Sequence, residues 1–201
     1  MDYEGQMTPV LPLRCIILAA GASRRLGEPK AMIEKNGTPL IQWMVNRLES
    51  KGIEPIIVTR QELMLDIALC CPDRTIVVNP NPDAGRTGSI RCGILHIHSE
   101  KSKVRPYRLL MVPVDRPGFS DDTLSTIIDQ HKCCVPSKDG KGGHPIMLTQ
   151  NEIEIILSEK DPDKPLREIV TPEYVEVNDE NLHLNLDHQI DIEKWQNIVN
   201  R

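Results

Sequence analysis

The sequence has few aromatic residues and no long apolar run. Phe, Trp and Tyr together make up 3% of the 201 residues, so a folded core must consist mainly of aliphatic side chains. No apolar stretch approaches the ~20 residues that span a bilayer as a helix. Residues 1–12 also lack the basic start and the apolar middle of a secretory signal. These absences favour a cytoplasmic protein without a membrane segment, with a disordered leader over 1–12 and a single domain over 13–201.

The sequence also lacks a basic excess and a metal-binding spacing of cysteines. A formal net charge of −5 argues against nonspecific binding to nucleic acid or to a membrane surface, because polyanions attract basic proteins. None of the six cysteines forms a C-x-x-C pair. The adjacent pairs Cys70-Cys71 and Cys133-Cys134 are poor clamps for zinc. We expect buried thiols in a reducing compartment.

Apolar runs of strand length alternate with segments of helical periodicity. Strands are expected at 14–18, 55–59, 75–78, 109–112, 133–136, 145–148 and 174–177, and helices at 61–70, at 89–99, from 121, at 151–158 and from 191. Thr38 is expected to cap an earlier helix, with Pro39 at its first position. The buried stripe of that helix is expected to contain Leu40, Ile41, Met44, Val45 and Leu48. The alternation predicts an α/β fold, a three-layer αβα sandwich around a Rossmann-like, mostly parallel sheet.

Three segments that directly follow predicted strands carry small or polar residues: 19–30, 79–89 and 113–117. In open parallel sheets, ligands bind beyond the carboxyl ends of the strands, near the point where the strand order reverses. The sequence therefore predicts one site made from all three segments. Asn79 ends a strand on this side and is a candidate for contact with a base or a ribose.

The first of these segments has the composition of a phosphate-binding loop. In the run LAAGASRRLGEPK, small residues at the end of a strand allow a tight turn whose N–H groups can face an anion, and Arg25 and Lys30 add positive charge. The run contains neither a Walker loop nor G-x-G-x-x-G, because its glycines stand at 21 and 27. The residues favour a nucleotide bound through its phosphates. The alternative is an ordinary strand-to-loop transition with two solvated arginines.

Two further residues have the chemistry that a nucleotide site requires. Asp115 lies between Pro113 and Pro117 at a strand end, and carboxylate oxygens are ligands that Mg²⁺ prefers. The alternative is a turn aspartate that bonds to its own backbone. Ser89 is expected to begin a helix, where its hydroxyl can meet a phosphate or cap the helix.

Six segments, in order, resemble the motifs of the MobA-like nucleotidyltransferases, which include the enzymes that attach CMP or GMP to molybdopterin. The loop LAAGASRRLGEPK resembles L-x-x-G-x-S-x-R-M-G-x-x-K, and NGTPLIQW is similar to G-x-P-L. Residues 85–93 resemble G-x-x-x-S-[LI]-x-x-G, and residues 113–117 resemble C-D-x-P. Residues 143–145 resemble G-H-P, and 185–187 with Asp191 resemble N-x-[ND]-T-x-[ED]. The resemblance covers about residues 13–199.

The resemblance implies a fold of the nucleotide-diphospho-sugar transferase type and a Mg²⁺-dependent transfer of NMP from NTP to a phosphorylated acceptor, with molybdopterin as the candidate acceptor. The expected nucleotide-binding residues are Leu18, Ala19, Ala20, Gly21, Arg25, Lys30, Asn79, Gly85, Ser89 and Asp115. The expected catalytic residues are Arg25, Lys30 and Asp115, and His144 is expected at the acceptor. Asp115 and Asp187 are the expected metal ligands, with Asn185 as the alternative to Asp187. Asn185 and Asp187 would face the same side if they lay on a strand.

This chain departs from the family pattern at two places. Leu26 replaces the usual Met, and Arg86-Thr87-Gly88 stands where the family often has small hydroxyl residues. Arg86 adds a charge at this place, which keeps an acceptor other than molybdopterin open as an alternative. The resemblance further implies CTP over GTP, because cytidylyl-transferring members read A-A-G where guanylyl-transferring members tend to read L-A-G-G, and this chain has Ala19-Ala20-Gly21.

Three other readings compete with this one. The acceptor can instead be a sugar, polyol or isoprenoid phosphate, or the chain can be a non-catalytic nucleotide-binding or cofactor-carrier module. A dinucleotide-dependent oxidoreductase is disfavoured, because the second strand ends Val58-Thr59-Arg60 without an acidic ribose ligand. The expected partners are therefore a nucleoside triphosphate and a small phosphorylated acceptor, with no nucleic acid and no membrane, for a monomer or small homo-oligomer.

Overall fold

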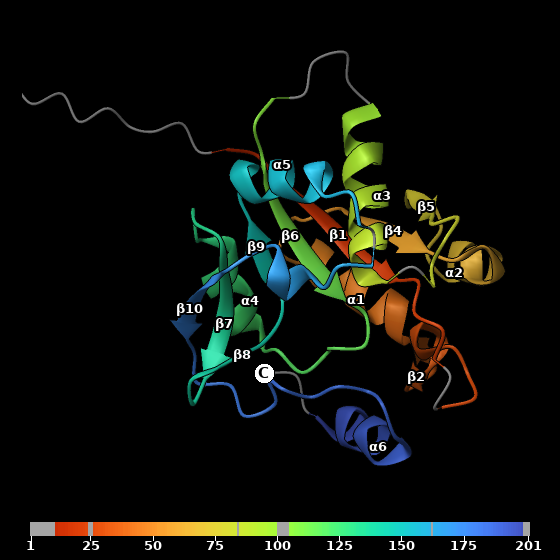
Figure 1. The fold of residues 1–201 in the computed structure, drawn as a ribbon. Helices are drawn as coiled ribbons and strands as arrows, with labels where there is room; N and C mark the ends of the chain where they lie inside the picture. Colours follow the sequence, from red (N-terminus) through yellow and green to blue (C-terminus); the bar gives the residue numbers. More distant parts are fainter. Residues whose placement is uncertain (1–10, 24–25, 84, 100–104, 162, 199–201) are drawn as a thin grey trace, which may run out of the picture.

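A continuous β-sheet lies between two layers of helices in the computed structural model, which describes residues 11–23, 26–83, 85–99, 105–161 and 163–198 (Figure 1). The strands are β1 (Leu13–Ala19), β2 (Glu34–Lys35), β3 (Thr38–Pro39), β4 (Pro55–Thr59), β5 (Ile76–Val78), β6 (Arg108–Pro113), β7 (Cys134–Lys138), β8 (Lys141–Gly142), β9 (Ile146–Leu148) and β10 (Glu173–Glu176). The α-helices are α1 (Leu40–Glu49), α2 (Met64–Cys70), α3 (Arg86–Ser99), α4 (Asp121–Ile128), α5 (Gln150–Ser158) and α6 (Gln189–Asn197). Short 3-10 helices are η1 (Lys30–Met32), η2 (Gln61–Leu63) and η3 (Leu166–Glu168).

The sheet is mostly parallel, as predicted. Its order is β10-β7-β9-β6-β1-β4-β5, with β8 paired to β7. β1 pairs in parallel with β4 and β6, whereas β9 runs antiparallel to both β6 and β7. The chain adds β4 and β5 on one side of β1 and then returns to the other side as β6. The strand order therefore reverses between β1 and β6, which is where a ligand site is expected in such a sheet.

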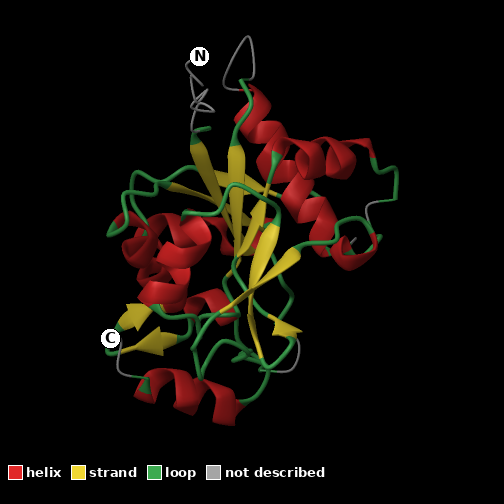
Figure 2. Ribbon diagram, turned by 90° about the vertical axis from the view of Figure 1, so that its left-hand side faces the viewer, coloured by secondary structure: helices red, strands yellow, loops and turns green. Residues whose placement is uncertain are grey.

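The alternation of side chains along the strands divides the core into two layers. In β1, Cys15, Ile17 and Ala19 face the helices α1, α2, α4 and α6, while Ile16 and Leu18 face α3 and α5. Figure 2 shows the strands in the middle with helices on both sides. The buried side chains are mainly aliphatic, which confirms the expectation from the low aromatic content.

The first helix confirms one prediction and contradicts another. Its predicted apolar stripe is buried along its whole length: Leu40, Ile41, Met44, Val45 and Leu48. Thr38, however, does not cap it. Thr38–Pro39 forms strand β3 and pairs with β2, so the backbone of Thr38 belongs to a small hairpin and the helix begins at Leu40.

Two other helices begin earlier than expected. α3 begins at Arg86, so Ser89 lies within its first turn and not at its start. α6 begins at Gln189, and Asp191 accepts a hydrogen bond from the backbone N–H of His188 at 2.9 Å as part of a capping box. Ser120 caps α4, because its hydroxyl accepts from the N–H of Thr123 at 3.1 Å.

The cysteines are free thiols, as predicted, but only three of the six are fully buried. All six cysteines are free; Cys15, Cys71 and Cys134 are buried, and the others are partly buried. Over the part of the chain that the structure describes, no helix combines the length and the apolar character needed to cross a membrane. Of the predicted leader, residues 1–10 lie outside the described residues.

Candidate active site

A cavity of about 480 Å³ opens at the carboxyl ends of β1 and β6. The three segments that follow β1, β5 and β6 all contribute to its wall, together with a residue from the loop before α6. The lining residues are Leu18, Ala19, Ala20, Gly21, Ala22, Ser23, Lys30, Ala31, Leu63, Pro82, Asp83, Gly85, Arg86, Ser89, Pro113, Val114, Asp115 and Asp187. The structure thus brings together most of the residues that the sequence analysis singled out, although Arg25 lies outside the described residues.

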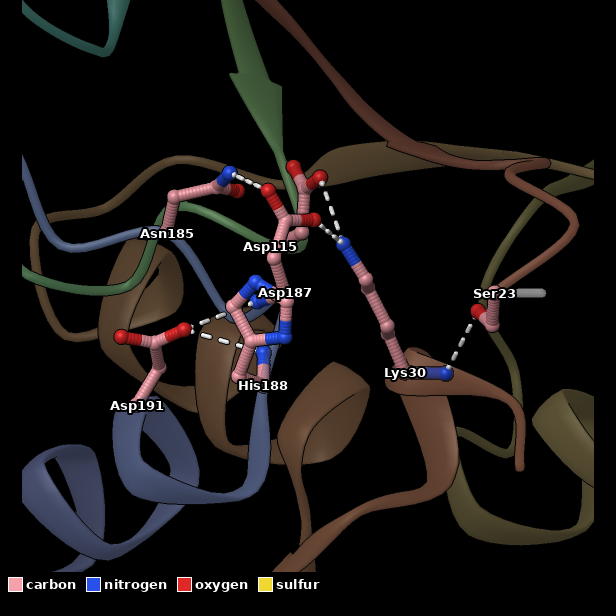
Figure 3. Close-up of polar contacts among 7 residues, drawn as sticks. All are labelled: Ser23, Lys30, Asp115, Asn185, Asp187, His188 and Asp191. Atoms are coloured by element: carbon pink, nitrogen blue, oxygen red, sulfur yellow. Dashed lines mark hydrogen bonds and ion pairs between the residues drawn. The ribbon is translucent and has the colours of Figure 1, made fainter. Parts of the chain in front are cut away.

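The loop after β1 is folded by its own polar groups. The hydroxyl of Ser23 accepts a hydrogen bond from the backbone N–H of Lys30 at 2.9 Å, and the carbonyl of Ser23 accepts one from Leu26 at 3.1 Å. Gly27 has a φ of +72°, a conformation that glycine adopts without strain. These bonds place Lys30 at the start of η1, where its side chain points toward the end of β6 (Figure 3).

Lys30 lies between two carboxylates. Its Nζ is 3.3 Å from Oδ2 of Asp115 and 2.7 Å from Oδ1 of Asp187 (Figure 3). The side chains of Lys30, Asp115 and Asp187 are 14%, 20% and 27% exposed, so solvent screens these pairs less than it screens pairs on an open surface. The cavity therefore contains a fixed cation held by two acidic side chains from distant parts of the chain.

Asp187 reaches the cavity from a loop and not from a strand, so the same-side argument for Asn185 and Asp187 does not apply. The backbone N–H of Leu186 donates to the carbonyl of Asp115 at 3.0 Å and holds this loop against the end of β6. Asn185 lies beside Asp187 because its Nδ2 donates to Oδ2 of that carboxylate. The backbone N–H of Asp187 donates to Asp191 at 3.3 Å, so the first turn of α6 also supports the loop.

α6 is fastened to the segment that follows Lys30. Trp195 is 1% exposed and packs edge-on against Trp43, with 5.6 Å between the ring centroids. Nζ of Lys35 donates to the carbonyl oxygens of Trp195 and Ile198 at 3.0 and 2.6 Å. We call these contacts of Trp195 and Ile198 with Trp43 and Lys35 the α6 clasp. The clasp keeps the loops that carry Lys30 and Asp187 next to each other.

The donor set around Lys30 fits a divalent cation with oxygen ligands. The carboxylates of Asp115 and Asp187 already converge on one positive group, and Oδ1 of Asn185 is buried without a hydrogen-bond partner among the described residues. Within those residues there is no group of three or more His, Cys, Asp or Glu side chains arranged for a metal. Two carboxylates suit Mg²⁺, which retains several waters and uses few protein ligands.

Ser89 and Asn79 form a buried pair at one side of the cavity. Nδ2 of Asn79 donates to the hydroxyl of Ser89 at 2.9 Å, and Oδ1 of Asn79 accepts from the N–H of Asn81 at 2.9 Å. Ser89 lines the cavity, whereas Asn79 lies behind it and is 3% exposed. This geometry lets Asn79 position Ser89, and its contact with a base or ribose stays a prediction.

His144 comes to the same edge of the sheet because β9 is antiparallel. Ile146 pairs with Met111, so the residues before β9, and not those after it, lie beside the end of β6. His144 does not line the cavity itself. Burial lowers the pKa of His144 to about 4, Arg86 and Arg116 act in the same direction, and Asp115 opposes them.

Sequence reasoning missed three residues of this region. Arg116, Ser23 and Asp83 were not among the candidates, although Ser23 belongs to the resembling loop and Arg116 directly follows Asp115. The position of Arg116 in the C-D-x-P segment is the only signal that pointed to it. No local pattern marked Asp83.

Comparison with known proteins identifies the family. Residues 15–177 match the model of the MobA-like NTP transferase domain. The chain is 27% identical over 129 residues to a protein named molybdenum cofactor guanylyltransferase from Xanthomonas euvesicatoria pv. vesicatoria (strain 85-10), covering 63% of this chain and 60% of that protein. It is 32% identical over 111 residues to a protein of the same name from Vibrio atlanticus (strain LGP32), covering 54% of this chain and 52% of that protein. The chain thus spans just over half the length of these relatives.

The fold is also similar to solved structures. Rv0371c from Mycobacterium tuberculosis H37Rv has a TM-score of 0.72 and 18% identity, over 94% of this chain and 100% of that chain. A structure of Rv0371c in complex with manganese has a TM-score of 0.70 and 17% identity, with the same coverage of 94% and 100%. These similarities confirm the predicted fold class. Because the family model covers most of the sequence, including most of β1 and all of β6, the chain belongs to the MobA-like NTP transferase family.

Proposed function

We propose that this protein transfers the NMP unit of a nucleoside triphosphate to a phosphorylated acceptor and releases pyrophosphate, with Mg²⁺ as the metal. The observation that carries the proposal is the position of Lys30 between Asp115 and Asp187 at the wall of the cavity. Lys30 and the two carboxylates lie where the strand order of the sheet reverses, between β1 and β6. Such groups can position a triphosphate and a metal ion and neutralise their charges, and these two effects supply most of the rate enhancement in phosphoryl transfer.

In the proposed reaction, an oxygen of the acceptor's phosphate attacks the α-phosphorus of the NTP. A new P–O–P bond forms, the bond between the α-phosphorus and its bridging oxygen breaks, and pyrophosphate leaves with the electron pair. No protein nucleophile is needed. Lys30 would hold the triphosphate together with N–H groups of the loop at 20–23, and Ser89 would contact it from the first turn of α3. Asp115 and Asp187 would hold Mg²⁺, which supplies charge neutralisation at the phosphate oxygens.

Molybdopterin is the acceptor that we propose, supported by the names of the two curated relatives. For the base we propose CTP, since Ala20 lines the cavity, where its methyl would narrow the space for a purine. GTP is the second candidate, because both relatives are named guanylyltransferases. The manganese complex of Rv0371c supports a divalent cation without distinguishing Mg²⁺ from Mn²⁺.

A pyrophosphate-release screen tests the proposal. Each of the four NTPs is combined with Mg²⁺ or Mn²⁺ and with molybdopterin, a sugar phosphate, a polyol phosphate or an isoprenoid phosphate. We expect release only with a phosphorylated acceptor, and best with CTP and molybdopterin. Release with another acceptor would reassign the acceptor alone. Release from no combination would favour a non-catalytic binding or carrier module. The single domain over 13–201, the cytoplasmic location and the monomeric or small homo-oligomeric state stay predictions.

A further inference from the structure

Two arginines and a neutral histidine come from the chain segments next to the metal candidates. Arg86 is the first residue of α3 and lines the cavity, Arg116 directly follows Asp115, and His144 precedes β9. The three residues come from three different elements. The antiparallel direction of β9 brings His144 to the end of β6, where Arg116 lies.

The electrostatic influence of these side chains on one another agrees with this placement. Burial is the largest cause of the low pKa of His144, and both guanidinium groups lower it further. Burial also lowers the pKa of Arg116, and the charge of Arg86 adds to this, while the carboxylates of Asp115 and Asp187 oppose it. Two guanidinium groups therefore lie within electrostatic range of each other and of one imidazole.

These groups have unused hydrogen-bonding capacity. Nε of Arg116 and Nδ1 of His144 are buried without a hydrogen-bond partner among the described residues. In the same part of the chain, neither Arg86 nor Arg116 forms an ion pair. A buried polar atom without a partner is costly in a folded protein, and clustered arginines repel one another, so such a group is stabilised by an anion that it can bind.

We infer that Arg86, Arg116 and His144 form an anion subsite that holds the attacking phosphate group of the acceptor, separate from the loop that we assign to the triphosphate. The inference rests on the proposed function and deepens it by naming residues that select the acceptor. The planar fork of a guanidinium group matches the geometry of a phosphate monoester. Neutral His144 can donate one hydrogen bond to a phosphate oxygen. The subsite therefore selects acceptors that carry a terminal phosphate dianion and disfavours uncharged hydroxyl acceptors.

The test uses the full chain, with the nucleotide pocket filled by a non-hydrolysable α,β-methylene NTP and Mg²⁺. Inorganic phosphate is then titrated and its binding followed by calorimetry at pH 7.5. Arg116→Gln removes the charge and the fork of a residue that does not line the cavity, and we expect phosphate to bind about tenfold or more weakly. Arg116→Lys keeps the charge and should lie between Arg116→Gln and the wild type. Arg91→Gln is the matched control, because Arg91 donates to the carbonyl of Glu159 on another face of α3, and its phosphate affinity should change less than twofold.

The outcomes separate this inference from the proposed function. Weaker phosphate binding in Arg116→Gln, with the affinity for the NTP analogue and the thermal melting temperature kept, supports the subsite. Phosphate affinity that is unchanged in Arg116→Gln, or no saturable phosphate binding by the loaded wild type, overturns it. A parallel loss of analogue affinity also overturns it, because the arginine would then serve the triphosphate. If the analogue does not bind the wild type at all, the proposed function fails, and phosphate binding that depends on Arg116 but not on Lys30 still supports the subsite.

Discussion

Replacing Lys30 by Met should make the nucleotide-free protein bind Mn²⁺ more tightly. Nζ of Lys30 stands 3.3 Å from Asp115 and 2.7 Å from Asp187, where a metal ion held by the same carboxylates would lie. In the wild type an incoming cation must displace this ammonium group, whereas in Lys30→Met the two carboxylates are left without their cation. A Met side chain fills much of the space of the lysine stem and brings no charge.

The size of the effect follows from the two contacts. Hydrogen bonds to charged groups contribute roughly 1.5–3 kcal/mol each, and the 3.3 Å contact belongs at the lower end of that range. In Lys30→Met, water can partly solvate the two carboxylates, because Asp115 and Asp187 are 20% and 27% exposed. We therefore expect the binding free energy of Mn²⁺ to become more favourable by only about 1.5–3 kcal/mol. This corresponds to a roughly 10- to 100-fold lower Kd for Mn²⁺.

The assay is a titration of free Mn²⁺ by electron paramagnetic resonance, without nucleotide. Lys51→Met, in the exposed turn after α1, is the matched control and should bind Mn²⁺ like the wild type. Adding Asp187→Asn to Lys30→Met should abolish the gain. Equal Mn²⁺ affinity of Lys30→Met and the wild type would refute the reasoning, because Lys30 would then not compete with the metal.

Three further predictions concern other side chains of the region. Asp115→Asn should lower kcat by about a thousandfold or more at saturating Mg²⁺ while the melting temperature is kept, since one metal ligand is worth several kcal/mol in the transition state; near-normal turnover would remove Asp115 from the metal site. Ala20→Gly should shift the ratio of kcat/KM for CTP and GTP toward GTP by roughly tenfold or more, because one methyl group is worth ~1–3 kcal/mol in a tight pocket; an unchanged ratio would place base selection elsewhere. Because burial lowers the pKa of His144 to about 4 from an unfolded value near 6.5, the unfolded chain takes up the proton first as the pH falls, and stability is lost between these values. When the pH is lowered from 7.5 to 5, the free energy of unfolding measured with urea should therefore fall by about 2 kcal/mol less in His144→Gln than in the wild type. Equal decreases in the two proteins would contradict a buried neutral imidazole.

Periodicity predicted most of the fold because it reports burial directly. The stripe from Leu40 to Leu48 and the strand from Pro55 to Thr59 follow from the spacing of apolar residues alone. The predicted capping role of Thr38 is wrong because Thr38 pairs with Lys35 of β2 instead. That contact lies outside the helix, so the capping preference of threonine alone does not reveal it. Local propensity is a weak guide where the backbone has a second partner.

The site was harder to predict than the sheet, since its parts are joined by tertiary contacts. The direction of β9 cannot be read from three apolar residues, yet it decides that His144 lies beside β6. The meeting of Lys30 with Asp187 depends on a main-chain bond from Leu186 to Asp115, which no motif spacing reveals. Arg116 was passed over because a charged residue in a turn is usually solvated.

The α6 clasp has a consequence for the order in which this site is assembled. Synthesis from the N-terminus makes Lys30, Lys35 and Trp43 well before Asp187 and Trp195. Until Trp195 packs on Trp43 and Lys35 bonds to the end of α6, the loop with Asp187 lacks one of its supports, although the bond from Leu186 to Asp115 can already form. A nascent chain can therefore form its central strands before Asp187 has joined Lys30 and Asp115. Under the proposed function, nucleotide and metal would be held together only once this loop is in place beside Lys30.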